Sequence, residues 1–285
     1  MRIIPKNIPN IIKITARIIL IIEISKYPIE KLLYRKDKIW SILIYLFYLN
    51  YLYISCDFFR FMRFAHLADC HLGGWRQPEL RQLNLDSFKK AIDICIERRV
   101  NFVIIAGDLF DSAYPPIEIL EEAFFHLKRL KDARISCYII AGSHDYSASG
   151  RTFLNVLEKA GFCKNLYNVE EKYGKLFLNP TIHENVALYG YPGKKSGLEV
   201  NELRNVKLQD SPFFKIFALH TSIREALGNL PIDAIAKDEL PEADYYALGH
   251  LHIDFLEERM VYGGPVFPNN FQELEELKYG RFYII

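Results

Sequence analysis

The sequence predicts an α/β fold for residues 62–285, with two packed β-sheets flanked by helices in a four-layer α-β-β-α sandwich. Three observations support this prediction. Apolar runs typical of buried strands alternate with helix-length segments between residues 62 and 142. Short strand-like runs follow from residue 176 to the end, without regular intervening helices. The 285 residues are 50% hydrophobic, which is enough to bury one large core or two small ones.

The first half alternates strand and helix in order. Residues 62–69 read as a strand that ends at a polar loop, and residues 78–99 as a helix in which Phe88, Ile92 and Cys95 recur at helical spacing. Residues 101–108 form a buried-type strand ending in Gly-Asp. Pro115 and Pro116 open a helix that runs to about Asp132, and residues 136–142 repeat the strand pattern.

The second half favours sheet over helix. Five further strands are expected at residues 176–191, 213–220, 243–252, 258–262 and 280–285. Two sheets packed face to face, with helices covering the outside, use these elements in the simplest way.

Residues 1–61 differ in composition from the rest of the chain. They contain no Gly and no His, whereas all 15 Gly and all 8 His follow Met62. We interpret them as a spurious or unstructured leader from a start placed too early. The alternative is a membrane anchor at residues 39–54, which are apolar apart from Ser41 and Asn50 but number 16, slightly fewer than the ~17–25 that span a bilayer.

Charge and cysteine content limit the cellular compartments and the binding partners to be expected. The formal net charge of +1 averages a leader of +6 and a remainder of −5. Five cysteines, none in a Cys-x-x-Cys pair, fit a reducing compartment, and we expect a cytoplasmic protein with no membrane association unless the leader is real.

Potential metal ligands stand at the ends of five expected strands. They are Asp69, His71, Asp108, Ser143, His144, Asp145, His220, His250 and His252. Strand ends of one sheet lie along one edge, where open α/β sheets bind ligands. His66, in contrast, is expected in a strand or the core, and His126 and His183 on the solvated surface.

The residue types indicate a two-metal centre. Asp and His donors suit Mn, Fe or Zn better than the oxygen-only shells of Mg and Ca. Seven of these residues are the expected ligands, namely Asp69, His71, Asp108, Ser143, His220, His250 and His252. Seven exceed one coordination shell, and a central carboxylate can bridge two ions, as in two-metal phosphoesterases. The expected chemistry is hydrolysis of a phosphoester by metal-activated water.

The segments HLADCHLG, AGDLFDS, AGSHD and YYALGHLH resemble the calcineurin-like metallophosphoesterases and, more narrowly, the SbcD-type nucleases of double-strand-break repair. The resemblance implies two divalent ions, with Mn²⁺ expected and Fe²⁺ or Zn²⁺ as alternatives. It implies that Asp69, His71 and His252 hold the first ion, that Asp108 bridges, and that His220 and His250 hold the second. His144 would face the scissile phosphate, with Asp145 beside it to orient the ring.

Two departures from the family pattern affect the functional reading. Ser143 stands where the family usually has Asn. The family usually continues past the phosphoesterase core into a capping domain, and we expect none here: either the protein is a minimal or truncated member, or another chain supplies that function. The resemblance implies DNA as substrate and an SMC-like ATPase as partner, with a homodimer as a further option. The charge of −5 keeps two alternatives open: a small-substrate phosphodiesterase and a non-catalytic scaffold. Candidate phosphate contacts are Arg76, Arg151, Lys194 and Lys195, and no substrate-binding residue is assigned.

Overall fold

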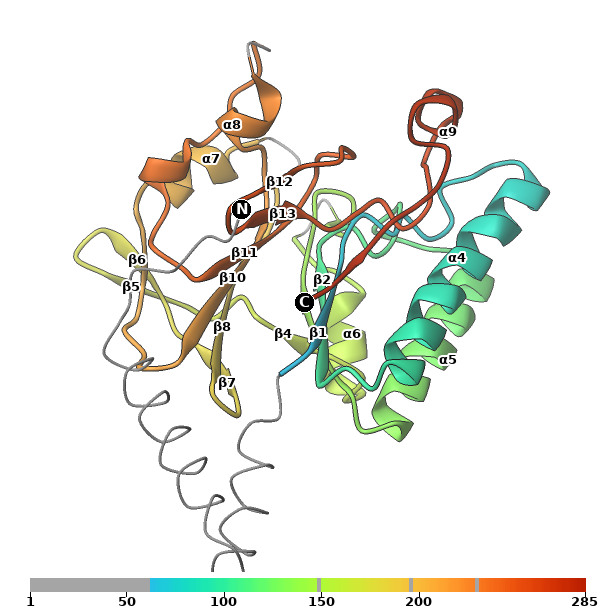
Figure 1. The fold of residues 1–285 in the computed structure, drawn as a ribbon, viewed down its shortest axis with the longest axis horizontal. Coiled ribbons are helices and arrows are strands. Elements are labelled where there is room, and N and C mark those ends of the chain that lie inside the picture. The colour runs from blue at the N-terminus through green and yellow to red at the C-terminus, as the bar shows by residue number, and fades with distance from the viewer. Residues whose placement is uncertain (1–61, 148–149, 195–196, 229–230) are drawn as a thin grey trace, which may run out of the picture. The chain divides into compact units, whose positions relative to one another are not determined.

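The first sheet is built from the strands that the alternating pattern predicts. In the computed structural model, which describes residues 62–147, 150–194, 197–228 and 231–285, the strand order is β14-β1-β2-β3-β4. The strands are β1 (Phe64–Leu67), β2 (Phe102–Ala106), β3 (Ser136–Ile140), β4 (Lys164–Asn165) and β14 (Tyr283–Ile284). Strands β1 to β4 are parallel, and β14 adds an antiparallel edge beside β1. The expected final strand is therefore confirmed as an edge strand (Figure 1).

Two long helices cover one face of this sheet. They are α4 (Pro78–Glu97) and α5 (Ile117–Asp132), which lie side by side in Figure 1. Helix α4 begins with Pro78, whose missing amide is tolerated in the first turn. It buries Phe88, Ile92 and Cys95 against the sheet, as their spacing predicts. A short helix, α6 (Leu154–Lys159), connects β3 to β4.

The second sheet has the strand order β12-β13-β11-β10-β8-β7. Its strands are β7 (Thr181–His183), β8 (Val186–Tyr191), β10 (Phe214–His220), β11 (Tyr245–Gly249), β12 (Leu256–Glu257) and β13 (Met260–Tyr262). The four central strands β8, β10, β11 and β13 are parallel, and the two edge strands are antiparallel. The expected strand at residues 176–191 is in fact three strands. Lys175–Leu178 belongs to a separate small sheet, and β7 and β8 pair antiparallel in the second sheet.

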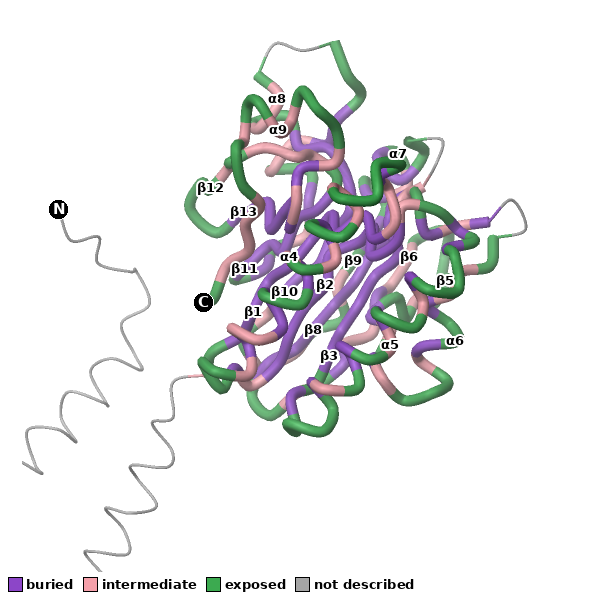
Figure 2. The backbone as a smooth tube through the Cα atoms, turned by 90° about the vertical axis from the view of Figure 1, so that its right-hand side faces the viewer, coloured by how far each residue is buried: buried purple, intermediate pink, exposed green. Residues whose placement is uncertain are grey.

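Apolar side chains from both sheets form the central core. Phe102, Ile104 and Ile140 of the first sheet pack with Ile216 and Ala247 of the second. The strands that carry them form the buried block in Figure 2. His66 lies in this layer, fully buried, with Nδ1 3.0 Å from the Tyr245 hydroxyl, as expected for a core residue.

The outer face of the second sheet is covered by a small third sheet and short helices. The third sheet contains β5 (Val169–Lys172), β6 (Lys175–Leu178) and β9 (Val206–Leu208). The helical segments there are α7 (Glu199–Leu203), α8 (Arg224–Leu227) and the 3-10 turn Lys237–Glu239. Helix α9 (Phe271–Leu277) lies elsewhere, with the Phe271 ring centroid 5.1 Å from that of Trp75 (Figure 1). The expected four-layer sandwich is therefore confirmed in outline, with a mixed outer layer on one side.

One histidine prediction is wrong. His126 is 3% exposed, because it lies on the inward face of α5 with its ring against Phe88. Burial lowers its pKa. His183 is partly exposed, with Nδ1 2.9 Å from the Tyr138 hydroxyl.

The two readings of residues 1–61 concern a segment outside the described residues. The domain boundary at Met62 stays a prediction. Among the described residues, no helix combines the length and apolar character needed to cross a bilayer.

Candidate metal centre

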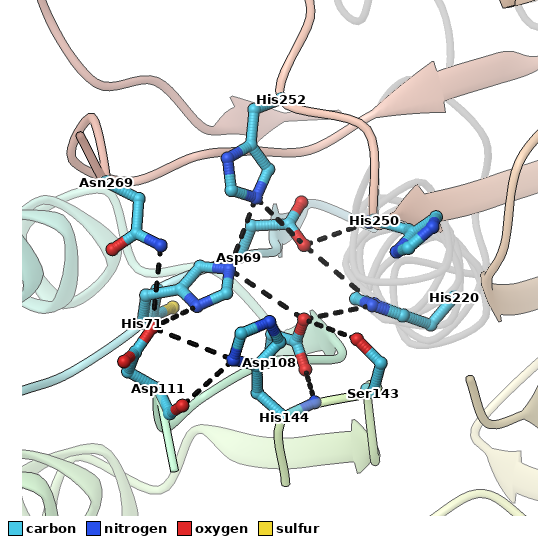
Figure 3. Close-up of polar contacts among 12 residues, drawn as sticks. Asp69, His71, Asp108, Asp111, Ser143, His144, His220, His250, His252 and Asn269 are labelled. Carbon is cyan, nitrogen blue, oxygen red and sulfur yellow. Dashed lines mark hydrogen bonds and ion pairs between the residues drawn. The ribbon is translucent and has the colours of Figure 1, made fainter. Parts of the chain in front are cut away.

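The carboxyl ends of the two parallel sheets meet at one place. Asp69 and His71 follow β1, and Asp108 follows β2. His220 is the last residue of β10, and His252 comes three residues after β11. Figure 3 shows these side chains converging from both sheets. The predicted gathering of strand-end side chains is therefore found.

The backbone is strained where it presents these residues. Asp69, His71, Asp108 and His250 have φ angles of 51°, 43°, 48° and 101°, a region that non-glycine residues rarely adopt. Such strain costs of order 1–3 kcal/mol per residue and concentrates at functional sites. Gly107 has φ of 90°, and a Cβ there would lie 2.1 Å from Nδ1 of His220. Only glycine therefore lets β2 and β10 approach each other here.

Asp69, His71 and His252 form the first set of donors, with one ligand atom of each within 4.8 Å of the others. The two Nε2 atoms of His71 and His252 are 3.2 Å apart. Nδ1 of His71 is 3.1 Å from Oδ1 of Asp111, and Nδ1 of His252 is 3.0 Å from Oε1 of Glu273.

Carboxylates at both Nδ1 atoms place the ring protons there and leave the two Nε2 lone pairs facing each other. Two acceptors this close repel each other unless a cation lies between them. A histidine that donates through Nδ1 to a carboxylate and points Nε2 inward has the arrangement typical of a metal ligand.

Asp69, Asp108 and His220 form the second set. Nδ1 of His220 is 3.0 Å from the carbonyl oxygen of Ala106, so this ring also turns Nε2 inward, 3.1 Å from Oδ2 of Asp108. The same Oδ2 is 3.8 Å from Nε2 of His71. One oxygen of Asp108 therefore lies between the two sets. Among the described residues, Oδ2 of Asp69 is buried without a hydrogen-bond partner, as suits a donor to a metal ion.

The protein environment shifts the titration of these groups. Burial opposes ionisation of Asp108, but His220, His71 and the His144 amide outweigh it and hold the pKa of Asp108 below its usual value. Burial raises the pKa of Asp69. Burial also opposes charge on His220, yet Asp108 and Asp69 raise the pKa of this imidazole to about 10. Without a metal, both ring nitrogens of His220 are therefore protonated at neutral pH, and the ring is positively charged.

Metal binding should release that proton. Because the pKa of His220 lies near 10 in the metal-free protein, a ligand nitrogen that binds metal at pH 7 must first lose a proton. We expect about one proton released per chain on titration with Mn²⁺ at pH 7, and an apparent affinity that rises about tenfold per pH unit toward pH 10. Calorimetric titration in two buffers of different ionisation heat measures this. Equal heats in both buffers would contradict the expectation.

Ser143 and His250 lie at the margin of these sets. The hydroxyl of Ser143 is 3.4 Å from Oδ2 of Asp108. The amide of His250 donates to Oδ1 of Asp69 at 2.9 Å, and its ring centroid is 5.1 Å from that of His220. His250 is not part of the three-residue donor clusters that the described His, Cys, Asp and Glu side chains form. Their roles as ligands of a second ion stay predictions.

Replacement of Ser143 by Asn tests the weaker of these positions. An amide oxygen is a stronger neutral ligand than a hydroxyl and reaches farther from the backbone. We expect Ser143→Asn to slow the loss of the second ion about 10-fold or more, on the scale of changes around metal sites. Metal content followed during dialysis measures this, with Ser112→Asn in the adjacent loop as control. Equal loss from Ser143→Asn and wild type would remove Ser143 from the metal shell.

His144 lies beside the metal donors and not among their inward-facing rings. Its ring centroid is 4.8 Å from that of His71, and its side chain is 46% exposed. Nδ1 is 2.9 Å from the carbonyl oxygen of Asp111. The carbonyl therefore holds the Nδ1 proton and leaves Nε2 free.

The structure gives Asp145 a role other than the one expected. Its two carboxylate oxygens accept hydrogen bonds from the amides of Phe110 and Gly142, at 3.1 and 2.9 Å, and the residue is 1% exposed. Burial and the nearby Asp108 raise its pKa to about 7. Asp145 thus ties two strand-end loops together. The hydrogen-bond partner found for the His144 ring is the Asp111 carbonyl, and not the Asp145 side chain that we expected.

Sequence reasoning missed Asp111, Glu273 and Asn269. Asp111 also forms a donor cluster with His71 and His144, and its position three residues after Asp108 was the available signal. Hydrogen bonding from His71 lowers the pKa of Asp111. Nδ2 of Asn269 lies 3.5 Å from Oδ1 of Asp111, and the backbone N–H of Asn269 donates to Oε2 of Glu273 at 2.7 Å. A segment near the C-terminus therefore braces the ligands from behind (Figure 3).

Comparison with known proteins agrees with this geometry. Residues 62–254 match the family model of the calcineurin-like phosphoesterases. The chain is 30% identical over 238 residues to the DNA double-strand break repair protein Mre11 of Methanocaldococcus jannaschii, covering 79% of this chain and 62% of that protein. It is 26% identical over 235 residues to the Mre11 protein of Archaeoglobus fulgidus, covering 76% and 52%. An uncharacterized metallophosphoesterase of Bacillus subtilis, YhaO, is 26% identical over 203 residues, covering 67% and 48%. The chain thus spans about half to two thirds of the length of these relatives.

Proposed function

This chain belongs to the calcineurin-like phosphoesterase family, and on that premise we propose that it is a metal-dependent DNA nuclease of the double-strand-break repair type. The observation that carries the metal dependence is the pair of Nε2 atoms of His71 and His252, which face each other at 3.2 Å with both Nδ1 atoms bonded to carboxylates. The similarity to Mre11 proteins supports DNA as the substrate.

The residues fit two divalent ions. Asp69, His71 and His252 would hold one, and Asp108 and His220 the other, with His250 and Ser143 beside it and Asp108 between the two. Mixed imidazole and carboxylate donors favour Mn²⁺, Fe²⁺ or Zn²⁺, of which we propose Mn²⁺. When bound, the ions would supply activation of water and neutralisation of charge on the phosphate oxygens.

The protein's own groups complete the chemistry. The Asp111 carbonyl fixes the His144 ring through Nδ1, so that the ring in its doubly protonated, imidazolium form can donate from Nε2 to the phosphate or give the Nε2 proton to the leaving oxygen. Asp111 and Glu273 hold the rings of His71 and His252 in the ligating orientation. An SMC-like ATPase partner and a homodimer belong to this proposal as well.

A side-by-side assay tests the substrate class. Mn²⁺-loaded protein is incubated with labelled single-stranded DNA, double-stranded DNA and bis(p-nitrophenyl) phosphate. The proposal expects metal-dependent cleavage of DNA that EDTA abolishes. Hydrolysis of the small diester without DNA cleavage would favour a small-substrate phosphodiesterase, which suits the net charge of −5 for residues 62–285. Metal binding without any hydrolysis would favour a scaffold.

A further inference from the structure

Two adjoining hollows lead away from His144. The inner hollow, of about 580 Å³, is lined by Asp111, Ser112, Ala113, Tyr114, Ser143, His144 and Ser147. The outer hollow, of about 930 Å³, is lined by Ala113, Tyr114, Ser147, Arg151, Thr152, Phe153, Asn155, Val156 and Lys159. Because they share Ala113, Tyr114 and Ser147, they form one groove from the metal centre to α6, here called the α6 groove.

The outer part of the α6 groove is basic. Arg151 and Lys159 are exposed and line it, and no acidic residue is among its lining residues. Asn155, Val156 and Lys159 share one face of α6 because they are three or four residues apart. The groove therefore carries positive charge on a unit whose net charge is −5.

The two cations of the α6 groove take part in no ion pair among the described residues. Nine other lysines and arginines there lie within 4 Å of a carboxylate. Arg151 and Lys159 belong to the larger group, which includes Lys90, for which the described residues supply no such partner. Unpaired cations lining a groove that opens from a phosphoesterase centre match the repeating phosphates of a nucleic-acid strand.

Tyr114 stands where the two hollows join. Its exposed fraction is 72%, and it projects from the loop that follows Asp108. An exposed aromatic ring beside a basic groove is an arrangement by which proteins bind single strands, with bases stacked on rings and phosphates on basic side chains. Paired bases in a duplex are already stacked on each other and do not offer their faces to such a ring.

We propose that the α6 groove holds a single-stranded segment of the substrate on one side of the scissile phosphate. The inner hollow takes the nucleotide next to that phosphate, Tyr114 stacks on the following base, and Arg151 and Lys159 bind the phosphates beyond it. This inference rests on the proposed nuclease function and names its preferred substrate, an unpaired strand.

The test compares substrates of different length on full-chain, Mn²⁺-loaded protein. kcat/KM is measured for a dinucleotide, which ends before Tyr114, and for a single-stranded oligonucleotide of about eight nucleotides, which fills the groove. We expect Tyr114→Ala to lower the oligonucleotide value divided by the dinucleotide value about 5- to 150-fold, which corresponds to the loss of one stacked base. Tyr114→Phe, which keeps the ring, should retain the ratio. Because it is a ratio, general damage to the metal centre cancels.

A second measurement isolates the charges. The dependence of kcat/KM for the oligonucleotide on salt should become shallower by about 0.7 in logarithmic slope for Lys159→Ala, and by a similar amount for Arg151→Ala. Lys90→Ala on α4 and Tyr173→Ala on the β5–β6 turn are matched exposed controls that should change neither quantity.

The outcomes separate this inference from the proposed function. DNA cleavage by the wild type, with Tyr114→Ala keeping the wild-type length ratio, overturns the groove assignment and leaves the nuclease function standing. A wild type that prefers duplex to single strand also overturns it. Failure of the wild type to cleave any DNA, with hydrolysis of bis(p-nitrophenyl) phosphate intact, overturns both.

Discussion

Replacing Asp108 by Asn is expected to remove at least one metal ion per chain and to lower kcat/KM about 1,000-fold. Oδ2 of Asp108 lies 3.1 Å from Nε2 of His220 and 3.8 Å from Nε2 of His71, so a negative oxygen between both donor sets is lost. An amide supplies no such charge. Loss of several kcal/mol of electrostatic stabilisation corresponds to about three orders of magnitude in rate.

The Asn variant keeps the shape of the side chain and an acceptor for the His144 amide, which donates to Oδ1 of Asp108 at 2.8 Å. Elemental analysis after Mn²⁺ loading gives the metal content, and circular dichroism verifies the fold. In the metal-free variant, the pKa of His220 should fall from about 10, since burial then acts without its main opposing charge.

Asp238→Asn, at an exposed position in the 3-10 turn, is the control for the loss of one acidic charge. Full metal content in Asp108→Asn would contradict the proposed bridging position.

The first sheet and its helices were predictable because each of their segments has a strong local pattern. Residues 102–106 are a continuous apolar run whose members are all buried, as expected for a parallel strand covered on both faces. The third sheet was not predictable in the same way. Strand β5 has the sequence VEEK and is mostly exposed, so its strand character comes from pairing with β6 and not from local apolar alternation.

The gathering of the candidate metal ligands was predictable for a similar reason. Asp69, Asp108 and His220 each follow or end an apolar strand, and the ends of parallel strands share an edge. The residues that brace the ligands had no such signal. Glu273 contacts His252 across 21 residues of sequence and lies in an acidic stretch of α9 that reads as a solvated face. His144 is held by a main-chain carbonyl, a partner that side-chain identities cannot reveal.

The His144 side chain carries the second large expected effect, which bears on chemistry and not on metal binding. His144→Asn should lower kcat about 100-fold or more, the usual scale for loss of a general acid or of a group that stabilises transition-state charge. Neither of the two sets of metal donors includes His144, although His144 forms a separate cluster with His71 and Asp111. Metal content should therefore stay near the wild-type value.

Leaving-group dependence distinguishes the two roles open to His144. If Nε2 protonates the leaving oxygen, the rate loss in His144→Asn should be large for a DNA diester, whose leaving alkoxide needs a proton. It should be small for bis(p-nitrophenyl) phosphate, whose leaving phenolate does not. If Nε2 stabilises charge on the phosphate, both substrates should lose rate by similar factors. His183→Asn, at a partly exposed histidine that contacts Tyr138 on another face of the core, is the matched control. A different outcome would contradict this assignment. If His144→Asn protein lost its metal while its metal-loaded fraction kept the wild-type specific rate, His144 would be a metal ligand through the cluster with His71 and Asp111. The division between metal binding by the donor sets and chemistry by His144 would then be wrong.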